Sequence, residues 1–242
     1  MKSLIFFCLF FLSFFIFSQE KFSREVSFIT DNDLYVSTAK DRYYTSGFFL
    51  SYRYLSKTKK ENQEKKIFEW LIGHEMYTPY KSIVKSINAH DRPFASYLYG
   101  SFGINRIYKK NTTLNTTLQI GIVGPNAFGE ELQNFIHNIY GFKEAIGWKF
   151  QIKNAFGFNF NTNYNQFLVK DPSNHYDLSW INSVKLGTVY TNISSGFYAR
   201  LGFKPLAKII NSIAFKTNLN DKNTNFERAI ECRDRIKRIE KE

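Results

Sequence analysis

Residues 147–162 read GWKFQIKNAFGFNFNT, and this stretch decides the fold class. Apolar side chains, most of them aromatic, occupy every second position from Trp148 to Phe160 except Asn154, and Lys, Gln, Asn and Gly fill most positions between them. Side chains on a β-strand point alternately to the two faces of a sheet. The stretch therefore predicts a strand with one apolar face and one polar face.

The same alternation recurs in residues 46–54, 113–123 and 195–203. A soluble sandwich would turn the apolar faces inward, whereas an outer-membrane barrel would turn them toward lipid around a polar interior. The apolar faces are rich in aromatic residues, and the segments reach about ten residues, the length of a tilted membrane strand. These features favour an all-β, antiparallel outer-membrane β-barrel. An exported β-sandwich that binds glycans stays as the alternative.

The N-terminal residues 1–18, MKSLIFFCLFFLSFFIFS, have the composition of a secretory signal peptide and are short for a membrane span. In the mature chain Cys232 would be the only cysteine, which excludes an intramolecular disulfide and a cysteine-based zinc site. The formal net charge of +12 would suit nucleic acid. Because the chain is predicted to be exported, we expect no nucleic-acid partner and instead an anionic glycolipid surface.

Polar segments at 56–66 and 170–176 are predicted to be turns or loops. Residues 130–140 have helical spacing instead, with an apolar stripe formed by Leu132, Phe135, Ile136 and Ile139. A second face of this helix carries Gln133, His137 and Tyr140. The helix would line or plug the lumen of a barrel, or cap its rim. His137 is then either a base that titrates near neutral pH or a packed imidazole.

Other polar residues allow both a structural and a functional interpretation. Asn32 and Asp33 carry the hard oxygen atoms that calcium prefers, but such a pair also suits a solvated turn. Taken alone, Thr45 is an ordinary strand residue, and His74 is interpreted as structural.

Six motifs occur in a fixed order: TDND (30–33), DRYYTSG (41–47), HEMYTP (74–79), DRPFASYLYG (91–100), GIVGPNAFGEELQNFIHNIYG (121–141) and GWKFQ (147–151). As an ordered set, over about residues 27–203, they resemble the lipid A 3-O-deacylase family of outer-membrane enzymes. The resemblance implies a barrel of about twelve strands and a calcium-dependent esterase. Such an enzyme removes the 3-linked acyloxyacyl group from the lipid A of lipopolysaccharide in the outer leaflet. We expect it to act as a monomer.

The resemblance also implies roles for individual residues. His137 matches the general base, and Thr45 matches a threonine of the site. Asn32 and Asp33 match an Asn-Asp pair of the site and are the candidate calcium ligands, although Asp31 leaves the register of this pair open by one residue. Lys143 stands where the family has an acidic residue, and Glu144 beside it is the candidate for the acidic role.

The chain is expected to divide into the signal peptide (1–18), a deacylase-like barrel domain (19–203) and a divergent tail (204–242). The tail reads as a charged helix from Phe226 and does not end on a strand with a terminal aromatic residue. The final strands of the barrel are therefore expected to be missing or replaced, either by truncation or by a genuine disordered tail. This tail and Lys143 motivate a rival hypothesis, a non-enzymatic barrel that serves as a small pore or a structural protein.

Overall fold

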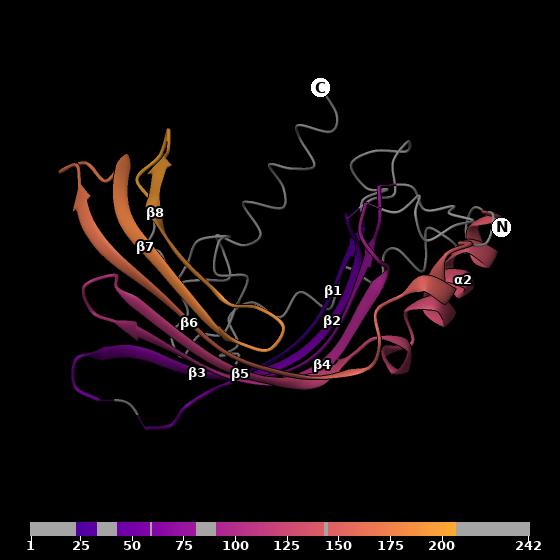
Figure 1. Ribbon diagram of the computed structural model, residues 1–242. Helices are drawn as coiled ribbons and strands as arrows, with labels where there is room; N and C mark the ends of the chain where they lie inside the picture. The colour runs from indigo at the N-terminus through magenta and orange to yellow at the C-terminus, as the bar shows by residue number, and fades with distance from the viewer. Residues whose placement is uncertain (1–22, 33–42, 59, 81–90, 143–144, 207–242) are drawn as a thin grey trace, which may run out of the picture.

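The computed structural model describes residues 23–32, 43–58, 60–80, 91–142 and 145–206. Its strands form one eight-stranded sheet in which each strand pairs antiparallel with the next along the chain. The strands are β1 (Arg24–Asn32), β2 (Tyr43–Leu55), β3 (Gln63–Thr78), β4 (Ala95–Tyr108), β5 (Thr113–Val123), β6 (Ala155–Lys170), β7 (Tyr176–Gly187) and β8 (Asn192–Leu201). The sheet curves into a trough with β1 and β8 at its edges (Figure 1). The predicted all-β antiparallel fold is confirmed, although in the described residues the sheet does not close.

The two faces of the sheet differ in the way that a membrane barrel requires. On the outward face large apolar side chains are exposed, among them Val26 (71%) and Trp70 (55%). On the inward face polar side chains such as Lys65, Asn159 and Asp177 are buried. A soluble sandwich buries its apolar faces, whereas a membrane barrel exposes them to lipid and keeps a polar interior. The described strands therefore contradict the sandwich alternative.

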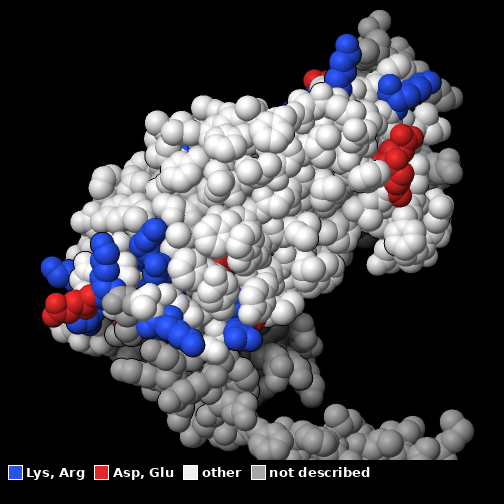
Figure 2. Space-filling view, turned by 90° about the horizontal axis from the view of Figure 1, so that it is seen from below, with Lys and Arg blue, Asp and Glu red and all other residues white. Residues whose placement is uncertain are grey.

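Charged side chains gather at the two ends of the outward face. Figure 2 views the convex side of the sheet and shows a broad surface with few charges between groups of Lys and Arg at opposite ends. This surface has the form of the apolar band of a membrane barrel, which is about 25 Å tall. No helix among the described residues is long and apolar enough to cross a membrane.

The strand connections distinguish the two rims of the trough. At one rim, here called the short-turn rim, the connections are residues 56–62, 109–112 and 171–175. The other, here called the long-loop rim, carries the longer connections 33–42, 79–94 and 124–154 together with the tight 188–191. Outer-membrane barrels have short turns on the periplasmic side and longer loops outside the cell. In an outer-membrane barrel the long-loop rim would therefore face the cell exterior.

Charged and phenolic groups on the inward face satisfy one another. Arg53 on β2 donates to Glu25 at 2.9 Å and also contacts Glu69. Near the long-loop rim, Glu75 accepts hydrogen bonds from the hydroxyls of Tyr77, Tyr99 and Tyr190. Burial, and then the nearby Glu75 carboxylate, raises the pKa of Tyr190 in the β7–β8 connection, so this phenol remains a donor. These contacts pair several of the charged and phenolic groups that face the interior.

Several predicted boundaries were wrong. Residues 148–150 form a 3-10 helix, η5 (Trp148–Phe150), and β6 begins only at Ala155. Trp148 is fully buried in this 3-10 helix, so it matches the alternating pattern in the sequence without belonging to the strand. The loop predicted for 56–66 ends earlier, because residues from Gln63 onward pair with β4. The strand predicted for 195–203 runs from Asn192 to Leu201. The predicted signal peptide and most of the predicted tail lie outside the described residues.

Candidate functional site

Four neighbouring strands present a row of residues on the outward face at the long-loop rim. The row runs Asn32, Ser46, Met76 and Ser96, and each residue lies opposite the next in the register of β1 to β4. By alternation Asn32 shares its face with the exposed Phe28. Asp31 belongs to the inward face, where it accepts a hydrogen bond of 3.3 Å from the hydroxyl of Tyr44. Asp33 lies outside the described residues.

Thr45 joins this outward face because β2 bulges there. The register of β2 against β3 shifts between Tyr44 and Ser46, so Thr45 has no direct partner in the ladder. A β-bulge re-aims the side chain of the inserted residue. The Thr45 hydroxyl lies 2.7 Å from that of Thr78, and both residues are buried. The hydroxyl groups of Thr45 and Thr78 therefore lie together on the outward face of β2 and β3, near Met76.

The segment after β5 folds back over the same outward face. It forms the 3-10 helix η4 (Pro125–Ala127) and the α-helix α2 (Gly129–Tyr140). His74 on β3 donates through Nε2 to the carbonyl oxygen of Ala127 at 2.6 Å. Ser96 on β4 donates to the carbonyl oxygen of Gly124 at 3.1 Å. His74 is thus a structural residue, as its sequence context suggested, and it ties η4 to the sheet.

The start of α2 touches the sheet without room for a side chain. A Cβ atom added at Gly129 would lie 2.5 Å from the ring of Trp148 and 2.6 Å from the Cβ of Ser96. Both distances are well below ordinary carbon–carbon contact. Glycine is therefore required where α2 crosses β4.

Side chains of α2 complete a buried cluster on the sheet. Leu132 and Ile136 pack against the buried residues Met76, Phe94, Ala145 and Trp148. The Trp148 indole donates to the side chain of Gln133, which is also buried, at 2.6 Å. The other half of the predicted apolar stripe, Phe135 and Ile139, is more than 60% exposed and points away from the sheet. Figure 1 shows α2 outside the trough at the long-loop rim, so the helix neither lines nor plugs the lumen.

His137 lies in the last turn of α2 and is half-buried. Its ring meets that of Phe142 edge-on, with 5.8 Å between the centroids. The helix ends at Gly141 in a left-handed conformation, and the Phe142 amide returns to the His137 carbonyl at 2.8 Å. Lys143 and Glu144 follow directly but lie outside the described residues. The structure thus brings Asn32, Thr45 and the helix of His137 to one face and one rim.

A family model described as "Outer membrane protein LpxR" matches residues 4–228. The chain belongs to this family. It is therefore an outer-membrane protein, as the sequence motifs predicted. A second model, described as "UvrB/uvrC motif", matches residues 222–242, which lie outside the described residues.

One solved structure with the same fold is LpxR from Salmonella typhimurium. Its TM-score is 0.55 at 22% sequence identity, and the match covers 66% of this chain and 53% of that one. This chain thus spans about half the length of that LpxR protein. A comparison with curated proteins gives no match.

The donor atoms of the candidate site suit a hard cation. The Asn32 side-chain oxygen and the hydroxyls of Thr45 and Thr78 share the outward face, and oxygen atoms are the ligands that calcium takes. Within the described residues no group of three His, Cys, Asp or Glu side chains could hold a metal. Asp33 and Glu144 fall outside that search, so the predicted calcium site stays a prediction.

Sequence reasoning missed several contacts around the site. These are the pairing of Thr78 with Thr45, and the close approach of Gly129 and the Gln133–Trp148 hydrogen bond that hold α2 on the sheet, although each residue lies within one of the quoted motifs. Gly129, directly before the predicted helix, was the available signal, because glycine there suggests close packing.

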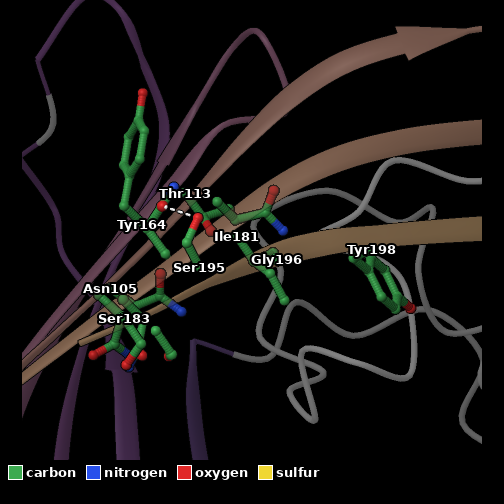
Figure 3. Close-up of a pocket in the computed structure, with 13 residues that line it drawn as sticks. Asn105, Thr113, Tyr164, Ile181, Ser183, Ser195, Gly196 and Tyr198 are labelled. Atoms are coloured by element: carbon green, nitrogen blue, oxygen red, sulfur yellow. Dashed lines mark hydrogen bonds between the residues drawn. The ribbon is translucent and has the colours of Figure 1, made fainter. Parts of the chain in front are cut away.

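A hollow on the other side of the fold does not suit hydrolysis. It has a volume of about 560 Å³ and lies between β4 and β8, lined by uncharged polar side chains such as Asn105, Thr113 and Ser183 (Figure 3). Ser195 at its edge donates to Asn182 at 2.9 Å. Among the described residues, no His, Asp or Glu lines this hollow, so these residues offer it no general base for neutral pH.

Proposed function

We propose that the protein hydrolyses the 3-linked acyl ester of lipid A in the outer leaflet of the outer membrane. The observation that carries this proposal is the position of α2. The helix of His137 packs on the outward face of the sheet at the long-loop rim, which would face lipid and the cell exterior in an outer-membrane barrel. A site there opens to the outer leaflet, where lipid A lies, rather than to the barrel lumen.

In this proposal His137 is the general base. Its neutral imidazole takes a proton from a water molecule as the water oxygen bonds to the ester carbonyl carbon. The imidazolium then returns the proton to the sugar oxygen as the ester C–O bond breaks, leaving a free fatty acid and a free hydroxyl group. Glu144 would orient the imidazole. The Thr45 hydroxyl, held beside that of Thr78, would add a polar group next to the substrate.

Asn32 and Asp33 would hold a calcium ion, whose charge would polarise the ester carbonyl and stabilise the developing oxyanion. The role of Asn32 is supported by its pairing with Ser46, which puts it on the same outward face as Thr45.

The outward face also offers a place for an acyl chain. A hollow of about 690 Å³ lies in the apolar band, lined mainly by Val26, Leu50, Trp70, Ile72, Phe102 and Ile120. It exists because Gly100 has no side chain, and a Cβ there would meet nothing within 4 Å. Gly100 lies opposite Ile72 on β3, and Ile72 is two residues from His74 on the side toward the short-turn rim. An acyl chain that descends from the site would therefore enter an apolar groove.

The test is a lipid A mass spectrum from cells that lack other deacylases. Expression of the wild-type chain with calcium should remove one 3-linked acyl group, and His137→Ala should abolish the change. The matched control is His175→Gln, an exposed histidine in the 171–175 turn at the opposite rim. Heat-modifiable migration in gels checks that each variant is folded. An unchanged lipid A pattern for folded wild type, or full activity of His137→Ala, would contradict the proposal.

The rival pore hypothesis makes a different forecast in the same preparation. Folded protein would conduct ions in planar bilayers and leave lipid A intact whether calcium or a chelator is present. Loss of acyl groups that stops on chelation and returns with calcium would exclude it.

A further inference from the structure

A pair of cations stands on the outward face near the short-turn rim. Lys66 on β3 lies directly opposite Arg106 on β4, and both share the face of the exposed Trp70. Figure 2 shows Lys and Arg gathered at this end of the convex side. Like charges that face each other across two strands destabilise a sheet. Neither side chain forms a salt bridge within the described residues.

Both side chains lean toward the apolar band instead of toward water. The Lys66 ammonium lies 4.8 Å from the centre of the Phe68 ring, and Arg106 donates to the Thr116 hydroxyl at 3.0 Å. Phe68 and Thr116 lie on either side of Ile104 in the register of β3, β4 and β5. The two cationic groups therefore flank Ile104, each one same-face position further into the band. Isolated cations at a membrane edge would instead extend toward the aqueous rim.

This location corresponds to the headgroups of the inner leaflet. From Lys66 to His74 the strand covers roughly 26 Å, which is roughly 20 Å of depth at a tilt of about 40°. The His74 end is the long-loop rim and faces the cell exterior, so the Lys66 end lies near the periplasmic edge of the apolar band.

We propose that Lys66, Arg106 and Thr116 bind the phosphate of an anionic phospholipid in the inner leaflet of the outer membrane. An anion between the two cations relieves their mutual repulsion, and the Thr116 hydroxyl adds a donor. Tyr108 and Tyr164 line an adjoining hollow at this rim, where amphipathic rings meet headgroups. The binding site rests on the membrane placement of the sheet and is independent of the proposed hydrolysis.

The experiment measures lipid binding to the full-length protein by native mass spectrometry from detergent, with phosphatidylglycerol or phosphatidylcholine added. Wild type should retain phosphatidylglycerol preferentially. Because each cation near an anionic surface contributes about fivefold to binding, Lys66→Gln with Arg106→Gln should weaken retention about 25-fold. The matched control is Lys149→Gln with Lys153→Gln, which removes two exposed lysines at the opposite rim and should change little.

Further variants distinguish a loss of charge from a loss of folding. Competition experiments distinguish the phospholipid from other anions. Lys66→Arg should keep the binding, and each single Gln variant should lose about fivefold if the double variant does not fold. Equal retention of phosphatidylglycerol by wild type and the folded double variant would overturn the proposal. So would displacement of the lipid by millimolar inorganic phosphate, or a preference of these residues for lipid A over phosphatidylglycerol.

Discussion

Gly129→Ala is the smallest change that tests how α2 is held on the sheet. The added methyl group would lie 2.5 Å from the Trp148 ring and 2.6 Å from the Ser96 Cβ. Ordinary contact needs about 3.5–4.0 Å, so the helix or the indole must move by roughly 1 Å. Such overpacking costs about 1–3 kcal/mol. Alanine regains at most about 1 kcal/mol of helix propensity, so the variant should be net destabilised.

The same displacement should affect the rate of the reaction more strongly than it affects the free energy of unfolding. A displacement of about 1 Å in a catalytic group can lower a rate by roughly 100-fold. The assay is the rate of acyl release from lipid A, with urea unfolding of the membrane-inserted protein measured in parallel. Gly196→Ala is the control, because its Cβ would meet only an Ile181 carbon at 3.9 Å. Gly129→Ala with the stability and rate of wild type would show that α2 does not pack on β4 as described.

Two further changes address neighbouring contacts. Trp148→Phe leaves the buried Gln133 oxygen without its donor and should lower the unfolding free energy by about 1–3 kcal/mol. Trp180→Phe is the control, because it loses only an exposed hydrogen bond to Ser195 and should lower the unfolding free energy less. Equal losses of unfolding free energy in urea titrations would contradict this reasoning. Gly100→Leu fills the apolar groove and should slow release of long acyl chains about tenfold, as expected for the loss of one or two methylene contacts, while shorter esters are spared. An equal slowing of short and long esters would exclude the groove as the acyl site.

Alternation was enough to locate the most regular strands. The strand predicted at 113–123 is β5 itself, and the helix predicted at 130–140 starts one residue earlier, at Gly129. Alternation of apolar and polar residues did not identify β3, because Ile67, Phe68 and Leu71 put apolar side chains on both of its faces. Where the inward face is partly apolar, period two fades from the sequence although the strand remains.

The sequence could not tell which side of α2 meets the sheet. Leu132, Phe135, Ile136 and Ile139 form one apolar stripe, yet the structure divides it between the protein and the outside. In water a stripe of this kind would be buried as a whole. A helix on the lipid-facing side of a barrel has apolar surroundings on both sides, so hydrophobicity alone cannot assign its orientation. The buried contact between Gln133 and Trp148 decides it, and that contact depends on the fold.

The position of α2 on the lipid side can be measured with a spin label at Ile139→Cys in the Cys232→Ser background. Ile139 is 64% exposed on the side of α2 away from the sheet. Labels at Ile72→Cys in the apolar band and at Ser183→Cys on the inward face provide the lipid and lumen references. If α2 lies against the membrane, the Ile139 label collides with oxygen more than with a water-soluble nickel complex, as the Ile72 label does. A label at Ile139 that behaves like the one at Ser183 would place His137 on the aqueous side and contradict a site that opens to the outer leaflet.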